Sequence, residues 1–153
     1  METAPDDIVI PAFLRVARRA YGHAIGQRIA EAGFDDMPRN GPFVLGGMAN
    51  RGGTAAGLIR ELGVTKQAAS QLIDTLVLRG YLEREVNPDD RRRLNIVLTD
   101  RGRAAAAAVR AGVEQVDGEL AQRLSPEQLQ GFRAGLVALC DILDDLTSAE
   151  ASA

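Results

Sequence analysis

The sequence is poor in the residues on which many enzymes and metal sites depend. Its 153 residues include one histidine, one cysteine and no tryptophan, and aromatic side chains make up only 4%. His23 and Cys140 alone cannot assemble a zinc site rich in histidine or cysteine within one subunit, and a lone cysteine forms no internal disulfide. The glycine-rich phosphate loops GxGxxG and GxxxxGK[ST] are also missing, so we expect no enzyme, no metal and no cofactor.

Long hydrophobic runs are absent as well. No apolar stretch approaches the roughly 18 residues that a membrane-spanning helix needs. The acidic residues 1–7 lack the basic start and apolar stretch of a secretion signal. Hydrophobic residues reach 46% and charged residues 25%, which is the balance of a globular domain. These properties predict a cytoplasmic, helix-rich protein that does not enter a membrane.

Charge is unevenly distributed along the chain. The overall net charge is −3, but residues 50–110 carry ten arginines and Lys66 against seven acidic side chains, a local excess of +4. Residues 111–153 carry two arginines against eight acidic side chains, a local charge of −6. Because charges act over a Debye length of roughly 8 Å, a polyanion would respond to the basic middle of the chain and not to the overall average.

Periodicity, N-cap residues and glycine stops predict six helices and one hairpin. The expected helical ranges are 10–33, 37–50, 54–62, 65–79, 99–123 and 125–147. The second of these is rich in glycine, so packing has to hold it. The turn 62–65 between two short helices is typical of a helix-turn-helix, although an ordinary helical hairpin has the same pattern. Residues 81–86 and 94–98 alternate as two strands around a turn, and Leu94, Ile96 and Leu98 are predicted to point inward.

The last helix has a longer apolar stripe than a thin lobe needs. The stripe consists of Leu129, Phe132, Leu136, Leu139, Cys140, Leu143 and Leu146. Together with the first helix it predicts a second subunit. Within the single chain 1–153 we therefore expect residues 10–33 and 104–147 to form the dimerisation region and residues 37–103 to form a winged helix-turn-helix lobe. Cys140 is expected to be a buried structural thiol.

Two motifs, and the order of these parts, resemble the MarR family of winged helix-turn-helix transcriptional regulators. One motif is Thr65–Leu76 (TKQAASQLIDTL), followed by Arg79–Leu82 (RGYL). The other is Asn87–Arg93 (NPDDRRR), followed by Leu98–Arg103 (LTDRGR). The family typically has an acidic residue where this chain has Asn87, which is a mild departure, and the glycine-rich second helix is a larger one.

The resemblance implies a mainly α fold with a small β-wing, six helices, and a homodimer whose N- and C-terminal helices interlock. Two lobes would then face one DNA duplex, and the two-fold symmetry predicts a pseudo-palindromic operator. Members of the family are repressors more often than activators. They are commonly released from DNA by small phenolic or other lipophilic ligands, or by oxidation of a sensor cysteine. Peroxide-sensing relatives have that cysteine near the N-terminal helix, where this chain has none, so a redox sensor is disfavoured.

The helix after Thr65 separates apolar from polar residues. Its polar face consists of Lys66, Gln67, Ser70, Gln71 and Thr75. A helix in the major groove reads bases mainly from its N-terminal residues, where Gln pairs with adenine and Lys reaches guanine or phosphate. These five residues are the predicted base contacts, and a solvated polar face is the alternative interpretation.

The hairpin carries predicted contacts of a second kind. Arg91, Arg92 and Arg93 lie at its tip or just beyond it, where a guanidinium can enter a narrow minor groove. A solvated loop of charges is the alternative. Asp90 is expected to support the wing through an ion pair with Arg92, because a carboxylate facing phosphates would be repelled.

Five further residues are candidates for other contacts. Thr54, Arg79 and Arg84 are candidates for phosphate binding. Tyr21 and His23 on the first helix are candidates for lining an effector cavity, although interfacial packing is the more common role of such a pair. The sequence therefore predicts a DNA-binding regulator. The alternative is a winged helix used for protein contact or dimerisation without DNA.

Overall fold

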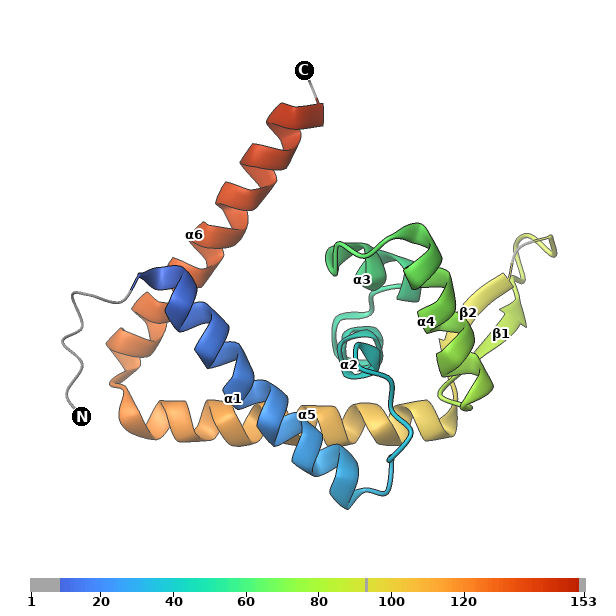
Figure 1. Cartoon of the computed structure of the whole chain (residues 1–153), viewed down its shortest axis with the longest axis horizontal. Helices are drawn as coiled ribbons and strands as arrows, with labels where there is room; N and C mark the ends of the chain where they lie inside the picture. Colours follow the sequence, from blue (N-terminus) through green and yellow to red (C-terminus); the bar gives the residue numbers. More distant parts are fainter. Residues whose placement is uncertain (1–8, 93, 152–153) are drawn as a thin grey trace. The chain divides into compact units, whose positions relative to one another are not determined.

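The computed structural model describes residues 9–92 and 94–151. In this part of the chain six α-helices and one hairpin follow in the expected order, which confirms the predicted mainly α fold with a small wing (Figure 1). The elements are α1 (Ile10–Glu31), α2 (Gly41–Arg51), α3 (Ala55–Glu61), α4 (Lys66–Leu78), β1 (Leu82–Val86), β2 (Leu94–Leu98), α5 (Asp100–Arg123) and α6 (Pro126–Ala151). No helix among the described residues has both the length and the hydropathy to cross a bilayer.

The chain divides into two compact units, one ending at Gln115 and the other beginning at Val116. The first unit holds α1 to α4, the hairpin and most of α5, and the second holds the end of α5 together with α6. Within the first unit, α1 packs closely on α5, since a Cβ at Gly112 would lie 2.6 Å from the Cα of Ile25. The Arg28 guanidinium also donates to Oε1 of Gln115 at 3.0 and 3.2 Å.

Side-chain caps define the helix starts where the sequence predicted them. The Thr54 hydroxyl oxygen accepts a hydrogen bond from the Gly57 amide at 3.1 Å, and Thr65 accepts one from Ala68 at 3.2 Å. At the start of α6 the predicted capping box is present. There, the Ser125 amide donates to Oε1 of Gln128 at 2.9 Å, and the Gln128 amide donates to the Ser125 hydroxyl at 3.3 Å.

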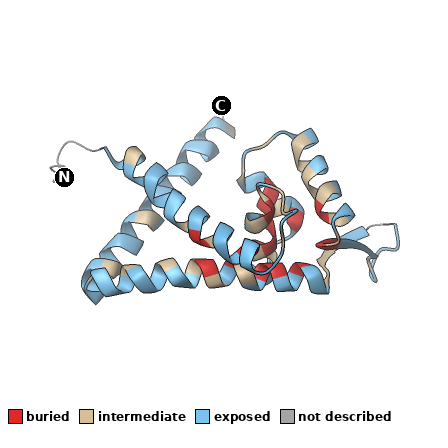
Figure 2. Ribbon diagram, turned by 60° about the horizontal axis from the view of Figure 1, so that its bottom comes forward, coloured by how far each residue is buried: buried red, intermediate tan, exposed pale blue. Residues whose placement is uncertain are grey.

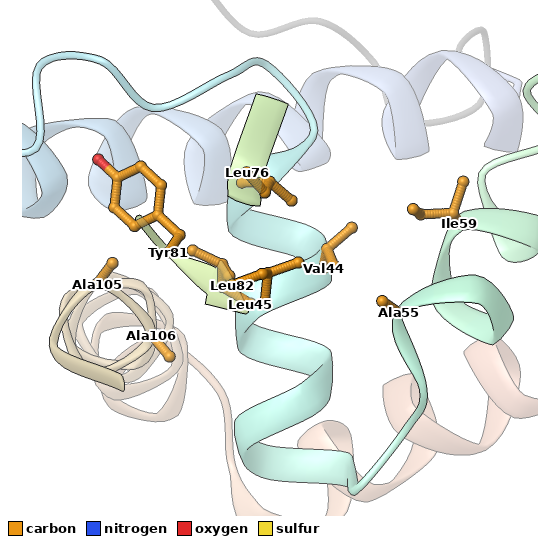
Figure 3. Close-up of a cluster of buried hydrophobic side chains, with 9 residues drawn as sticks. All are labelled: Val44, Leu45, Ala55, Ile59, Leu76, Tyr81, Leu82, Ala105 and Ala106. Carbon is orange, nitrogen blue, oxygen red and sulfur yellow. The ribbon is translucent and has the colours of Figure 1, made fainter. Parts of the chain in front are cut away.

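The core of the first unit surrounds α2 (Figure 3). It consists of Val44, Leu45, Ala55, Ile59, Leu76, Tyr81, Leu82, Ala105 and Ala106. The glycines of α2 permit close packing, because a Cβ at Gly47 would lie 2.5 Å from a methyl group of Leu58 and one at Gly46 would lie 3.1 Å from Val109. Tertiary packing therefore holds this intrinsically weak helix, as expected.

Two predictions of burial are wrong for this chain. Leu94 is 59% exposed, because it pairs with the equally exposed Val86 at the end of the hairpin, beyond the reach of the core. Cys140 is exposed, because α6 has no fully buried side chain among its residues up to Glu150 (Figure 2). The apolar stripe of α6 is not covered by any other described element of its own unit.

The start of α5 packs against Tyr81, which lies between α4 and β1. The Thr99 amide donates to the Tyr81 carbonyl at 3.1 Å, and the Thr99 hydroxyl oxygen accepts a hydrogen bond from the Gly102 amide at 3.0 Å. A Cβ at Gly102 would lie only 2.0 Å from the Tyr81 carbonyl oxygen. Only glycine fits at this position unless the backbone moves.

We expect Gly102→Ala to lower the free energy of unfolding by about 1–3 kcal/mol, because the added methyl group has to displace backbone. Urea denaturation followed by circular dichroism measures this change. Gly118→Ala on the same helix is the matched control, since nothing lies within 4 Å of its Cβ position and alanine favours a helix by up to about 1 kcal/mol. Equal stability of the two variants would contradict the steric argument.

Candidate nucleic-acid interface

The helix α4 presents a polar face to solvent and an apolar face to the core. Leu76 is fully buried, and Ala69, Leu72, Ile73 and Val77 pack partly buried against the same cluster. Four of the five predicted base-contacting residues are exposed, namely Lys66, Gln67, Ser70 and Gln71. The fifth, Thr75, is half-buried, and its hydroxyl donates to the Gln71 carbonyl at 2.7 Å. Its only hydroxyl hydrogen is therefore bound to the helix backbone.

The hairpin is anchored at the end nearest the core. Its antiparallel register runs from Leu82 opposite Leu98 to Val86 opposite Leu94. Leu82 is buried, and Ile96 and Leu98 pack against the core cluster. The strands lie beside α4, and the distal end of the hairpin projects away from the core (Figure 1).

Side chains order the turn that joins the two strands. The Asn87 side-chain oxygen accepts hydrogen bonds from the amides of Asp89 at 2.8 Å and Asp90 at 3.3 Å. Its amide group donates to the Asn95 side chain at 3.3 Å, across the hairpin. Asn87 thus performs the turn-forming role that a carboxylate could also perform, because both offer an oxygen to the amides that follow.

Asp90 contacts Arg92 differently from the expected ion pair. Its carboxylate accepts a hydrogen bond from the Arg92 backbone amide at 3.1 Å, because a short acidic side chain readily reaches the amide two residues ahead. Arg91 and Arg92 are exposed, and neither guanidinium has an ion-pair partner among the described residues. Arg93, the third predicted wing residue, lies outside the described residues.

The three candidate phosphate contacts all have intramolecular roles. The Thr54 side chain caps α3, and the Arg79 guanidinium donates to the backbone carbonyl of Asp36. Arg84 on β1 forms an ion pair with Asp74 on α4, and both side chains remain partly exposed, at 38% and 66%. This pair links the candidate reading helix directly to the wing.

A cluster that the sequence did not predict surrounds Tyr81, the residue between α4 and β1. The Arg101 guanidinium lies 4.6 Å from the ring centroid of Tyr81 and 5.3 Å from that of Phe34, and it forms a 2.9 Å ion pair with Asp36. The buried Tyr81 hydroxyl donates to the same Asp36 carboxylate. Phe34 and Asp36 are distant in sequence from both Tyr81 and Arg101. The sequence signalled only Tyr81, within RGYL, and Arg101, within LTDRGR.

The cluster shifts two pKa values in opposite directions. The hydrogen bond from Tyr81, reinforced by the charge of Arg101, lowers the pKa of the Asp36 carboxyl below its ordinary 3.8. Burial, together with the hydrogen bond to Asp36, raises the pKa of the Tyr81 hydroxyl above its ordinary 10.0. The folded protein therefore favours a charged Asp36 next to a neutral Tyr81.

The remaining predicted site residues lie on α1, where Tyr21 is half-buried and His23 is exposed. Among the described residues, no group of three or more histidine, cysteine, aspartate or glutamate side chains is arranged to hold a metal ion.

Comparison with known proteins adds sequence and structural relatives. A family model described as "MarR family" matches residues 36–93. The uncharacterized protein Rv2011c of Mycobacterium tuberculosis is 33% identical over 93 residues, which are 61% of this chain and 65% of that protein. The match thus spans slightly less than two thirds of that relative's length.

Two crystal structures have the same fold. The crystal structure of MarR superposes with a TM-score of 0.73 at 19% identity, covering 96% of this chain and 99% of that one. The Staphylococcus aureus MepR–DNA complex superposes with a TM-score of 0.69 at 22% identity, covering 88% of this chain and 98% of that one. These likenesses establish the fold.

Asp36→Asn should make the free energy of unfolding fall less steeply as the pH is lowered into the acid range. A carboxyl whose pKa is lower in the folded than in the unfolded chain adds stability above the unfolded value, and this stability is lost as the pH falls through the folded value. We therefore expect the wild-type free energy of unfolding to decline below about pH 4 more steeply than that of the variant. Urea denaturation at a series of pH values measures both slopes. Tyr81→Phe keeps the ring but removes the hydroxyl that lowers the pKa of Asp36, so it should also make the decline in the free energy of unfolding at acid pH shallower. Parallel slopes for the wild type and both variants would contradict the cluster's role.

Proposed function

Because the chain belongs to the MarR family of winged helix-turn-helix transcriptional regulators, we propose that it is a sequence-specific DNA-binding repressor that acts as a homodimer. As a member of this family it is not an enzyme. One observation carries the proposal: a single lobe presents both the exposed polar face of α4 and a hairpin whose tip arginines have no ion-pair partner among the described residues. The similarly folded MepR of S. aureus is known in complex with DNA, which supports it further.

In this proposal α4 enters the major groove and reads base edges from its first two turns. Gln67 and Gln71 are suited to paired hydrogen bonds with adenine, Lys66 to guanine or phosphate, and Ser70 to several bases. Each well-placed bidentate pair discriminates by about 1–3 kcal/mol. Thr75 retains a place at the edge of this face, where its methyl group can contact a thymine methyl while its hydroxyl stays bound to the helix.

The hairpin supplies the second contact, with its arginines in the minor groove. Arg91 and Arg92 lie in a loop that Asn87 and Asp90 hold through backbone amides, so both guanidinium groups are left available for DNA. Arg93 belongs to the same proposal. A narrow minor groove concentrates negative potential and attracts such groups with little dependence on base identity.

The proposed dimer uses apolar surface that a single chain leaves in water. Exposed apolar side chains gather on the first half of α1 and along α6: Ile10, Phe13, Leu14, Val16, Phe132, Val137, Leu139, Ile142, Leu143 and Leu146. A surface of this kind is typical of a protein interface. Residues 10–33 and 104–147 are therefore the proposed dimerisation region, with residues 37–103 as the DNA-binding lobe. Two recognition helices about 34 Å apart require a pseudo-palindromic operator.

We also propose regulation by a small lipophilic or phenolic effector, with Tyr21 and His23 as its contacts. The close packing of α1 on Gly112 of α5 supports this idea, because an effector bound beside Tyr21 would act on a helix whose backbone at Ile25 directly contacts α5. Each tenfold loss of DNA affinity requires about 1.4 kcal/mol of differential effector binding. A regulator of this kind acts in the cytoplasm.

The decisive experiment is charge reversal at the wing. Duplexes are first selected from random DNA with the wild-type protein, and the affinity for the selected site is then measured by fluorescence anisotropy at physiological salt. We expect Arg91→Glu combined with Arg92→Glu to weaken binding by at least about 100-fold, because like charges then face each other across the interface. Arg39→Glu with Arg60→Glu makes the same change in net charge at two exposed residues that are not among the proposed contacts, and this variant should retain most of the affinity.

The outcomes separate the candidate functions. Binding that survives the Arg91 and Arg92 reversal would show that the wing does not contact DNA. Failure of the wild-type protein to select any duplex would favour the alternative function, a winged helix for protein contact or dimerisation.

Asp74→Asn should strengthen DNA binding and steepen its salt dependence. The Asp74 carboxylate forms an ion pair with the Arg84 guanidinium. Removing this carboxylate leaves the guanidinium free to bind a DNA phosphate. One additional phosphate contact raises the slope of log affinity against log salt by about 0.9. Anisotropy titrations between 50 and 200 mM salt measure the slope. Adding Arg84→Ala should cancel the rise in DNA affinity and in salt slope. A rise that persists without Arg84 would assign the effect to the loss of the Asp74 charge alone.

A further inference from the structure

The exposed side of α4 carries one carboxylate among its neutral polar residues. Asp74 is the only acidic residue of α4, and its side chain is 66% exposed. Since an α-helix turns by about 100° per residue, Asp74 lies about 20° from Gln67 and about 60° from Gln71 around the helix axis. Both glutamines belong to the proposed base contacts. Asp74 is not one of the five residues predicted from the sequence, yet it projects from the same side of the helix.

The buried side of α4 confirms this placement. Leu76 is fully buried, and it lies about 160° from Asp74 around the helix axis. The carboxylate thus points almost directly away from the core. A duplex that contacts Gln67 and Gln71 would therefore also face Asp74.

A neighbouring cation offsets the charge of this carboxylate. The Arg84 guanidinium on β1 donates to Oδ1 of Asp74 at 2.5 Å, and β1 lies beside α4 (Figure 1). DNA phosphates would repel an isolated carboxylate, and the ion pair reduces that repulsion. Only Oδ1 takes part in the ion pair, so Oδ2 is available to accept a further hydrogen bond.

We propose that Asp74 is a specificity-determining residue that selects cytosine at one position in each half of the operator. This inference rests on the proposed function and adds a residue that restricts the choice of site. An ionised carboxylate only accepts hydrogen bonds. In the major groove cytosine offers an amino donor, whereas guanine offers two acceptors, thymine offers one, and adenine places an acceptor beside its amino group. The carboxylate therefore pairs best with cytosine and rejects guanine most strongly.

Helix geometry indicates where this cytosine lies in the operator. Asp74 follows Gln71 by three residues, which rise by about 4.5 Å along the helix. One base step along DNA is about 3.4 Å. The selected cytosine is therefore within about two base pairs of the base that Gln71 contacts. A two-fold symmetric dimer repeats this position once in each half-site.

Selection from random duplexes with the wild type and with Asp74→Asn tests this role. We expect the wild type to prefer cytosine at that position by at least about fivefold, and a parallel selection with Gln71→Ala marks the neighbouring base. An asparagine both accepts and donates, so Asp74→Asn should lose the preference at this position alone and should also accept adenine. Sequencing of the bound duplexes measures the preference. Fluorescence anisotropy with four duplexes that differ at this base pair measures the affinities.

Two further variants separate base reading from other effects. Arg84→Ala keeps the carboxylate but removes the ion pair, so it should bind more weakly and still prefer cytosine. Asp100→Asn is the matched control, because Asp100 is an exposed carboxylate in a 2.6 Å ion pair with Arg103 and lies outside α4. This control should select the same bases as the wild type.

Three results would overturn the inference. One is a wild-type operator without a preferred cytosine within two base pairs of the Gln71 contact, and this result needs no Asp74 variant. Another is an unchanged set of base preferences in Asp74→Asn. The third is loss of the same preference in Arg84→Ala, with its helices intact by circular dichroism, which would mean that the ion pair only positions α4. A wild-type protein that selects no duplex would instead refute the proposed function.

Discussion

The lobe depends on the contact between the start of α5 and the carbonyl of Tyr81. The absence of a side chain at Gly102 lets the two backbones meet, and Thr99 joins them by hydrogen bonds on either side. Tyr81 itself follows α4 and leads into β1, and its ring and hydroxyl hold Arg101 and Asp36. The helix α4, both ends of the hairpin and α5 therefore share one junction. The two proposed DNA contacts would have to be held in one frame to act together, and this junction provides it.

Local chemistry explains why much of the fold could be predicted from sequence. A threonine cap, a capping box or a turn asparagine forms its hydrogen bonds within about four residues. A short stretch of sequence is therefore enough to predict it. The polar face of α4 follows from periodicity alone, and four of its five predicted residues are exposed. The fifth, Thr75, differs because a hydroxyl in a helix can bond to the carbonyl four residues before it, which spacing does not reveal.

Contacts between residues distant in sequence could not be predicted. Asp36, Tyr81 and Arg101 come together only when α2, β1 and α5 are in place. The ion pair of Arg84 with Asp74 likewise depends on how β1 packs on α4. Cys140 was expected to be buried because it lies on an apolar stripe, but such a stripe shows that a surface needs a partner without showing that the same chain supplies it. In each case the missing information is three-dimensional.

The distribution of charge bears on the proposed binding of DNA. DNA is a polyanion, yet the chain carries a net charge of −3, with the excess of acid after residue 110. Residues 50–110, which include Arg91 and Arg92 of the wing, carry a local excess of +4. Because charges act over a Debye length of roughly 8 Å, DNA would respond to this local excess and not to the net charge of the chain. On this argument an acidic protein can still present a surface that attracts DNA.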